Sequence, residues 1–281
     1  MDNLDLRLLR DTLLAALRED VGAGDITSHA TIPANARATG RYTTKQALVV
    51  AGVPVIHAMM RLVDPDLQFK SVAFDGCSVA TGAVLAEVHG SARSILAVER
   101  TSLNLLQRMC GIATLTHQYV DRIAGTRTRI VDTRKTAPGL RVLDKYAVSC
   151  GGGMNHRMGL FDGVLIKNNH LIFHPSVAHA IQEARRNLGH LVKIEVEVRT
   201  LDELRTAVDG GADVILLDNF EAEQTRRAVE IVNGRIPLES SGGVTLETVC
   251  SFAEAGVDYI SVGALTHSAP AADIHLRVTA E

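Results

Sequence analysis

Cysteine is scarce and scattered in this sequence of 281 residues. The four cysteines, Cys77, Cys110, Cys150 and Cys250, lie far apart and form no CxxC pair. This spacing argues against a structural zinc site and against a disulfide framework. We therefore expect reduced, buried thiols, as is usual for free cysteine.

Basic surfaces and long apolar runs are missing as well. A net charge of -3 and a pI near 6.4, with no basic run interleaved with aromatics, argue against nucleic-acid binding. No apolar run approaches membrane-spanning length, and the charged N-terminal segment is unlike a signal peptide. The sequence therefore predicts a cytoplasmic protein that binds neither nucleic acid nor membrane, in which any anion is met by a local cluster of cations.

The first part of the chain mixes helical and strand-like patterns. Leu6, Leu9, Leu13 and Leu17 recur at helical spacing, until glycines and the cap residue Asp25 break the pattern. β-like runs follow at residues 39–43, 48–51, 69–74 and 84–89, with a predicted helix at 54–62. Closely spaced strands with one helix among them predict an α+β layer.

The rest of the chain alternates between helical segments and short β-branched runs. Residues 92–124 have a helical pattern interrupted at Gly111. The predicted strands that follow are TRIVDT (128–133), GVLIK (163–167), KIEVEV (193–198), DVILLD (213–218), IPLES (236–240) and YISVG (259–263), with a weaker seventh candidate in YAVSCGGG (146–153). Such alternation predicts a parallel sheet covered by helices, and seven units favour an α/β barrel over an open sheet.

Cations gather at the carboxyl ends of these predicted strands, where chemistry occurs in such barrels. They are Arg134, Lys135, Arg157 and Lys167, with His156 a further candidate. A single one would be explained as a solvated turn, but several on one rim would be costly to desolvate without a ligand. The ligand is therefore expected to carry several negative charges, and the Arg fork suits carboxylate or phosphate.

Acids and glycines share the same strand ends. Glu195 and Glu197 lie on one face of their strand, with Glu197 nearer the mouth, and Asp218 ends the next strand. Such acids imply ligand hydroxyls, a ligand-borne Mg²⁺ or a developing positive charge. Backbone N–H groups near Gly242 and Gly263 suit a phosphate. A sugar polyphosphate with Mg²⁺, reacting through an oxocarbenium-like centre, meets these conditions.

The densest motif is CGGGMNHRMGLFDGVLIKNNH, at residues 150–170. Its consecutive glycines fit either a flexible turn or the close backbone approach that a bound ligand requires. His156 and His170 lack a third partner at a recognised metal-ligand spacing. No protein-bound metal is therefore predicted from this motif.

Several short motifs occur in a specific order and spacing: EDVGAGDIT, ERTSLNLLQRMCGIAT, DTRKTAPGLR, KYAVSCGGGMNHRMGLFDGVLIKNNH, IEVEV, LLDN, ESSGGV and SVGALTHSAP. Over nearly its whole length the chain thus resembles the quinolinate phosphoribosyltransferase family. The resemblance implies an N-terminal α/β sandwich domain, placed at residues 1–110 and joined by 268–281, and a seven-stranded, TIM-like α/β barrel at 111–267. It also implies that quinolinate and phosphoribosyl pyrophosphate, with Mg²⁺, give nicotinate mononucleotide, pyrophosphate and CO₂ in NAD biosynthesis.

The resemblance also assigns roles to residues. Those implied around the pyridine dicarboxylate are Arg134, Lys135, His156, Arg157 and Lys167, and Thr133 is implied as a further substrate-binding residue. Lys135 would also meet phosphate, while Glu197 and Asp218 would face the ribose and its Mg²⁺-pyrophosphate; these three are the implied catalytic residues. Those implied at the 5-phosphate are Ser241, Gly242, Gly243, Gly263 and Ala264. Arg100 would reach the neighbour's site across a homodimer or in a higher oligomer.

Some positions depart from the family pattern, and other functions remain open. Asn168 stands where an acidic residue is more frequent, Cys110 where Ser is frequent, and Phe161 where Tyr is common. A Schiff-base aldolase is an alternative, because Lys167 ends a barrel strand. A relative associated with molybdate transport and a non-catalytic binding protein are the others; the motifs GDITS and LIKNNH favour the quinolinate enzyme over the former.

Overall fold

The computed structural model describes residues 4–281, except for the side chains at positions 7 and 8. The chain divides into two compact units, each built from separate segments. The first comprises Met1–His117, Thr136–Gly152 and Leu265–Glu281, and the second comprises Gln118–Lys135 and Gly153–Ala264. Compared with the predicted first domain of 1–110 and 268–281, the first unit also includes residues 111–117, 136–152 and 265–267.

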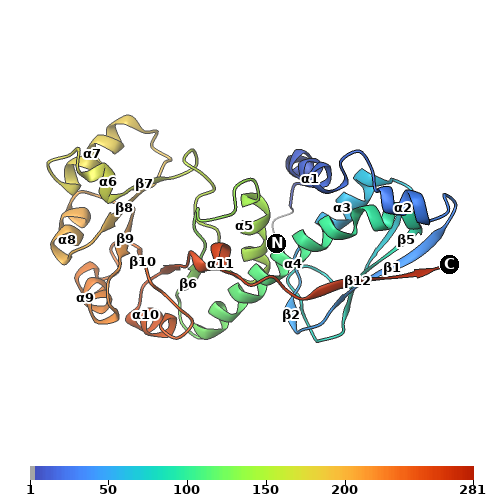
Figure 1. Cartoon of the computed structure of the whole chain (residues 1–281). Coiled ribbons are helices and arrows are strands. Elements are labelled where there is room, and N and C mark those ends of the chain that lie inside the picture. The colour runs from blue at the N-terminus through green and yellow to red at the C-terminus, as the bar shows by residue number, and fades with distance from the viewer. Residues whose placement is uncertain (1–3) are drawn as a thin grey trace. The chain divides into compact units, whose positions relative to one another are not determined.

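The first unit contains an antiparallel sheet in the order β12-β1-β5-β3 and a small β2-β4 ladder. Its strands are β1 (Arg37–Thr44), β2 (Leu48–Val49), β3 (Gln68–Ser71), β4 (Ser78–Val79), β5 (Val84–Ser91) and β12 (Ile274–Ala280). Its helices are α1 (Leu6–Val21), α2 (Ile26–Thr31), α3 (Val53–Val63), α5 (Arg141–Cys150) and most of α4 (Ala92–Arg122) (Figure 1). The strands and the helix that were predicted up to residue 89 are confirmed, whereas α2, β4 and β12 were not predicted.

Two glycines allow α4 to pack closely against its neighbours. A Cβ at Gly40 of β1 would lie 2.9 Å from Val88 and 3.4 Å from Ile95 of α4. A Cβ at Gly111 would lie 2.1 Å from the carbonyl oxygen of Pro270. The predicted interruption of the helix at Gly111 is therefore wrong: α4 is continuous there, and glycine is needed for the crossing of the C-terminal segment.

The predicted seventh strand at residues 146–153 is also wrong, because most of it belongs to helix α5. Leu143, Ala147 and Val148 are buried at helical spacing, and this tertiary burial outweighs the β-branched character of the segment. Asp144 of α5 is fully buried and accepts two hydrogen bonds from Arg108, at 2.7 and 2.8 Å. These bonds raise the pKa of Arg108, and Asp144 also accepts from the Ala137 N–H at 3.0 Å.

Replacing Asp144 by alanine is expected to destabilise the first unit strongly. The change leaves the Arg108 guanidinium, which is 31% exposed, and the Ala137 N–H without this acceptor. Loss of a hydrogen bond to a charged group costs about 1.5–3 kcal/mol. Asp273→Ala is the matched control, because its side chain is 58% exposed in a 3.5 Å pair with Lys45 and exposed pairs contribute less than about 1 kcal/mol. Urea unfolding of both variants tests the difference, and equal midpoints would contradict it.

The second unit contains six parallel strands in the order β6-β11-β10-β9-β8-β7. They are β6 (Arg129–Val131), β7 (Val164–Ile166), β8 (Ile194–Val198), β9 (Val214–Asp218), β10 (Leu238–Ser241) and β11 (Tyr259–Ser261). These six strands were predicted. Within residues 4–281 the seventh position is a single parallel bridge between Met154 and Val131, and the ring of strands is not closed between Met154 and β7. The domain is thus a TIM-like α/β fold with an incomplete barrel.

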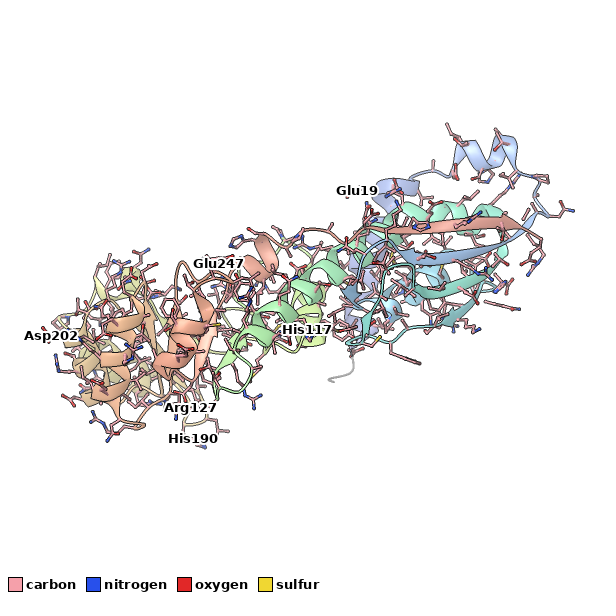
Figure 2. The ribbon with its side chains drawn as sticks, turned by 90° about the horizontal axis from the view of Figure 1, so that it is seen from below. Glu19, His117, Arg127, His190, Asp202 and Glu247 are labelled. Atoms are coloured by element: carbon pink, nitrogen blue, oxygen red, sulfur yellow. The ribbon has the colours of Figure 1, made fainter. Side chains whose placement is uncertain are left out.

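Helices cover the outside of these strands, as Figure 1 shows for α7 to α10. The helices that begin in this unit are α6 (Asn168–Leu171), α7 (Val177–Asn187), α8 (Leu201–Asp209), α9 (Ala222–Val232), α10 (Val249–Ala255) and α11 (Ala264–His267). Strand β8 is buried along its whole length, as expected for a parallel strand covered on both faces. Asp202, in the first turn of α8, lies on the outer surface (Figure 2).

The cysteines are free, and the prediction that they are buried is only half correct. Cys110 and Cys150 are buried, whereas Cys77 and Cys250 are partly exposed. Burial raises the pKa of the Cys110 thiol to about 12, so it is not a reactive thiolate. Among the described residues, no helix combines the length and apolar character needed to cross a membrane.

Candidate active site

One cavity of about 530 Å³ opens over the inner face of the second unit's sheet. Its strand-derived lining residues alternate along the strands: Leu165, Lys167, Glu197, Leu216, Asp218, Glu239, Ser241 and Ser261. The strand register places Glu197 beside Leu216 and Leu216 beside Glu239. Since successive side chains point to opposite faces, each of these strands contributes every second residue to the same space.

The loop after β6 carries cations and is tied to the loop that carries His156. Asp132 is fully buried and accepts from the His156 N–H at 2.8 Å and from the Asn155 side chain at 2.7 Å. Thr133 accepts from the Lys135 N–H at 3.0 Å, which holds a tight turn. Arg134, Lys135 and His156 thereby line the same cavity.

A charge pair bridges the ends of β7 and β8. Lys167 Nζ lies 2.8 Å from Glu197 Oε2, with the lysine side chain 47% exposed and the glutamate 9% exposed. Asn168 donates a second hydrogen bond to Glu197. His170 Nδ1 accepts a hydrogen bond from the Lys167 N–H at 2.8 Å. This nitrogen therefore caps the N-terminus of α6 and is not available as a metal ligand.

Arg157 is positioned beside another cation. Its guanidinium donates to the Gly163 carbonyl at 2.8 Å. Burial lowers the pKa of Arg157, and the charge of Arg134 lowers it further. Two guanidinium groups that disfavour one another's charge gain stability when an anion lies between them, which fits a dicarboxylate or a phosphate.

The ends of β9 and β10 form a polar rim with unusual backbone conformations. Asp218 accepts from Arg199 at 3.2 Å and from the Asn219 side chain at 2.9 Å. The Asn219 N–H donates to the Ser241 carbonyl at 2.8 Å. Gly242 has φ +100°, and a Cβ there would lie 2.2 Å from Asn219 Oδ1, so only glycine fits this turn.

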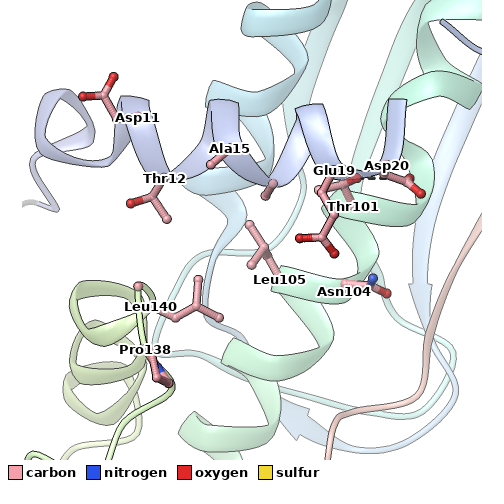
Figure 3. Close-up of a pocket in the computed structure, with 12 residues that line it drawn as sticks. Asp11, Thr12, Ala15, Glu19, Asp20, Thr101, Asn104, Leu105, Pro138 and Leu140 are labelled. Carbon is pink, nitrogen blue, oxygen red and sulfur yellow. Dashed lines mark hydrogen bonds between the residues drawn. The ribbon is translucent and has the colours of Figure 1, made fainter. Parts of the chain in front are cut away.

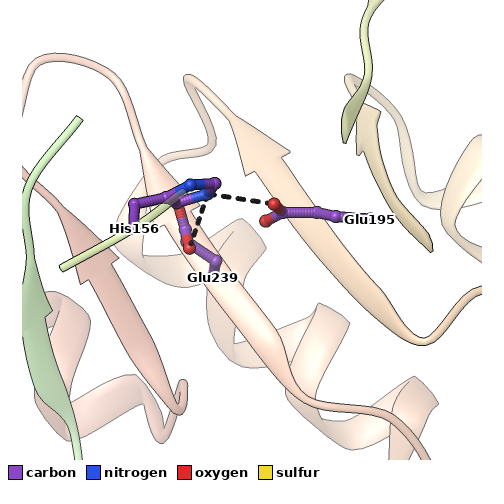
Figure 4. A group of neighbouring side chains, drawn as sticks. All are labelled: His156, Glu195 and Glu239. Atoms are coloured by element: carbon purple, nitrogen blue, oxygen red, sulfur yellow. Dashed lines mark hydrogen bonds and ion pairs between the residues drawn. The ribbon is translucent and has the colours of Figure 1, made fainter. Parts of the chain in front are cut away.

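Two acids and a histidine, His156, Glu195 and Glu239, lie close together (Figure 4), and two of them, His156 and Glu239, line the cavity. His156 Nε2 lies 3.0 Å from Glu195 Oε2 and 3.8 Å from Glu239 Oε2. Glu195 and Glu239 are 8% and 4% exposed. Burial, followed by the charge of Glu195, raises the pKa of Glu239 to about 7. The three groups have the spacing of a cation site, although no metal was predicted here.

The structure brings most of the predicted site residues together. Those that line the cavity are Thr133, Arg134, Lys135, His156, Arg157, Lys167, Glu197, Asp218, Ser241, Gly242 and Gly243. Gly263 and Ala264 follow β11 but are not among its lining residues, and Arg100 is an exposed residue of α4 in the first unit. Sequence reasoning missed Glu239, although an acid inside the apolar run IPLES was a usable signal.

A second cavity, of about 670 Å³, lies within the first unit between α1, α4 and the loop at 138–140 (Figure 3). Asp11, Glu19 and Asp20 line it, and Thr101 donates to Asp20 at 3.2 Å. Among the lining residues that the structure describes, none is a cation. Although this cavity is larger, its charge is wrong for an anionic substrate, so the 530 Å³ cavity is the candidate site.

The positions that depart from the family pattern leave this cavity intact. Asn168 binds Glu197 as a hydrogen-bond donor, which an acid could do only when protonated. Cys110 is buried in the first unit, where its thiol donates to the Ala51 carbonyl at 3.4 Å. Phe161 is 86% exposed and does not line the cavity.

Comparisons with known proteins agree over the whole chain. The family models for the N-terminal and C-terminal domains of quinolinate phosphoribosyl transferase match residues 25–110 and 112–277. The chain is 42% identical over 279 residues to a probable nicotinate-nucleotide pyrophosphorylase [carboxylating] of Bacillus subtilis, covering 99% of this chain and 95% of that protein. It is 45% identical over 273 residues to the nicotinate-nucleotide pyrophosphorylase [carboxylating] of Mycobacterium leprae, covering 95% and 96%.

Solved structures are similar to this chain over its whole length. The crystal structure of NadC from Streptococcus pyogenes aligns with a TM-score of 0.96 at 38% identity, covering 100% of both chains. The family model of the C-terminal domain, the relatives at 42% and 45% identity and the aligned crystal structure all cover the residues that line the cavity. The chain therefore belongs to the quinolinate phosphoribosyltransferase family.

Proposed function

We infer that the protein transfers the phosphoribosyl group of phosphoribosyl pyrophosphate to quinolinate with decarboxylation, giving nicotinate mononucleotide, pyrophosphate and CO₂ in NAD biosynthesis. The observation that carries this function is one cavity lined by Arg134, Lys135, Arg157 and Lys167 together with Glu197 and Asp218. The cations suit two carboxylates and a polyphosphate, and the acids suit a sugar that becomes positively charged.

The cations hold and orient quinolinate. Arg134 and Arg157 provide planar forks that bind carboxylates in two parallel hydrogen bonds. Held in this way, the pyridine nitrogen is aimed at the anomeric carbon of the ribose, so that proximity and orientation lower the barrier. Lys135 meets substrate carboxylate and phosphate, which makes it the third catalytic residue of the proposal.

The acids act when the bond to pyrophosphate breaks. Positive charge then develops on the ribose, and Glu197 and Asp218 stabilise it because they are already in place. The new bond makes the pyridine nitrogen a quaternary cation, which withdraws electrons from the ring. Loss of the adjacent carboxylate as CO₂ therefore needs little further help from the protein.

We propose that Glu197 and Asp218 would hold the Mg²⁺ carried by phosphoribosyl pyrophosphate, which would supply positive charge beside the leaving pyrophosphate. The cavity fits this ion, because carboxylate oxygens of Glu197 and Asp218 face the space beside the phosphate-binding glycines. The 5-phosphate is assigned to backbone N–H groups of Ser241, Gly242 and Gly243, with Gly263 and Ala264 at the neighbouring strand end.

We further propose a cytoplasmic homodimer or higher oligomer in which Arg100 contributes to the partner's site. An exposed arginine on α4 has the charge and reach to add one more cation to a dicarboxylate site. Mixing inactive Arg134→Ala with inactive Arg100→Ala is expected to restore part of the activity, because mixed dimers contain one site that carries both arginines. Activity no greater than that of the separate variants would contradict this assignment.

The alternative functions fit the site less well. A Schiff-base aldolase needs a lysine amine that is free to attack the substrate, whereas Lys167 Nζ is hydrogen-bonded to Glu197 at 2.8 Å. Borohydride trapping of substrate on Lys167 would favour the aldolase. A simple binding protein is disfavoured, because two acids beside an anion site weaken binding of the anion, whereas in an enzyme they can stabilise positive charge in the transition state. Turnover of quinolinate by the purified protein would exclude the relative associated with molybdate transport, and lack of turnover would favour it.

The direct test is to mix the protein with quinolinate, phosphoribosyl pyrophosphate and Mg²⁺ and to measure nicotinate mononucleotide. Replacing quinolinate by nicotinate is expected to lower kcat/KM by at least about 1,000-fold, because site groups built for the second carboxylate are then left unpaired. Comparable turnover of the two acids would show that the second carboxylate is not recognised.

A further inference from the structure

The acids beneath the cavity have a geometry that the proposed reaction does not use. Glu195 on β8 and Glu239 on β10 approach the same His156 nitrogen, and the three ligand atoms lie within 4.8 Å of one another (Figure 4). The Oε1 atoms of both acids are buried without a hydrogen-bond partner. Glu239 lines the cavity, whereas Glu195 does not.

His156 contacts both acids through one ring nitrogen. Its Nε2 lies 3.0 Å from Glu195 Oε2 and 3.8 Å from Glu239 Oε2, while its Nδ1 lies 2.7 Å from the backbone nitrogen of Arg157. The charge of His156 favours the ionised form of Glu239, but burial and the charge of Glu195 outweigh this effect.

Groups of both kinds face Glu239. Burial and the charge of Glu195 on β8 oppose its ionisation, while the charge of His156, the Ser261 hydroxyl on β11 and the charge of Lys167 favour it more weakly. Lys167 Nζ lies 2.8 Å from Glu197 Oε2, so its positive charge is paired mainly with Glu197 and not with Glu239. Two carboxylates this close in a buried site retain one proton between them, and burial gives that proton to Glu239, whose pKa is raised to about 7.

We propose that Glu239 is a substrate-binding residue in its neutral form, donating its O–H to a carboxylate of bound quinolinate from the floor of the cavity. This role rests on the proposed function, because it requires a dianionic substrate above the acid. An ionised Glu239 would repel that substrate, whereas the protonated acid adds a donor to the ring of cations.

The sign of the pH dependence follows from linkage. Glu239 is largely neutral below pH 7, and the negative charge of quinolinate raises its pKa further when the complex forms. At pH 8 the free protein has mostly lost this proton, so binding must take one up. Quinolinate affinity is then highest below pH 7 and falls as pH rises above it, by up to about tenfold per pH unit.

Calorimetric titration of the protein with quinolinate at pH 8, in two buffers of different ionisation enthalpy, measures this proton. The wild type is expected to take up between about half and one proton. Glu239→Gln keeps a donor at the same place but cannot ionise, so it is expected to bind quinolinate with no proton uptake and with an affinity that stays constant from pH 7 to 9. Glu183→Gln on α7, an exposed acid paired with Arg186, is the matched control and retains the uptake.

Other outcomes overturn the assignment. Quinolinate binding to the wild type without proton uptake, or uptake that persists in Glu239→Gln, removes the role of Glu239 and leaves the proposed function standing. Failure of the wild type to bind quinolinate at all contradicts the proposed function and the role together. Stoichiometric divalent metal in the purified protein that is lost in Glu239→Gln would show that the cluster holds a cation instead of a proton.

A second variant keeps the test valid if Glu239→Gln does not fold. Glu195→Gln removes the neighbouring charge while preserving the shape of the side chain and a hydrogen-bond acceptor for His156. The pKa of Glu239 then falls, so the quinolinate affinity is expected to begin its decline at a lower pH than in the wild type. An unchanged pH profile in this variant also overturns the role of Glu239.

Discussion

Replacing Glu197 by glutamine is expected to lower kcat by about 100- to 1,000-fold, while quinolinate still binds. Loss of one preorganised group aimed at charge in the transition state costs this much in comparable enzymes, about 2.7–4 kcal/mol. Glutamine preserves the shape of the side chain and one oxygen for Lys167, which lies 2.8 Å away. The loss therefore reports the missing negative charge more than a disrupted site. Steady-state kinetics and quinolinate calorimetry together separate turnover from binding.

Asp218→Asn provides an independent version of the same experiment. Asp218 ends the next strand and lies in the same cavity, with its side chain 19% exposed. Its replacement is expected to reduce kcat in the same direction, while Glu223→Gln on the outer helix α9 leaves kcat unchanged. If both site variants turn over at the wild-type rate, positive charge on the ribose is not stabilised by these acids.

The site was largely predictable because parallel strands bring their carboxyl ends to one edge of the sheet. Lys167, Glu197 and Asp218 lie at the carboxyl ends of the neighbouring strands β7, β8 and β9. Their positions at the ends of predicted strands therefore sufficed to predict that they share one site. Glu239 was not predicted because it lies inside the strand, two positions before Ser241 at the end of β10. Its importance depends on Glu195 and His156, which come from distant segments whose contact no local pattern reveals.

The fold was predictable where local pattern and tertiary packing agree. Strands β6, β7, β9 and β11 have apolar runs that match their burial, whereas β8 and β10 also bury the acids Glu195, Glu197 and Glu239. The strand predicted at residues 146–153 was wrong, because Leu143 and Ala147 are buried at helical spacing and most of this segment belongs to helix α5. At Gly111 a local helix breaker is tolerated because the Pro270 carbonyl occupies the space that any Cβ would need. Neither outcome can be derived from neighbours in sequence.

Replacing Arg134 by alanine is expected to raise the Kd for quinolinate by at least about 30-fold, because a truncated partner of a charged hydrogen-bonded pair costs about 2–5 kcal/mol. Arg134 lines the cavity beside Arg157, whose pKa its charge helps to lower. Arg134→Lys keeps the charge without the planar fork, so its affinity should lie between those of the wild type and the alanine variant. Arg226→Ala, on the outer surface of α9, removes the same charge far from the cavity and should leave the Kd unchanged. Titration calorimetry measures all four proteins, and wild-type affinity in Arg134→Ala would refute the role of Arg134 in holding the dicarboxylate.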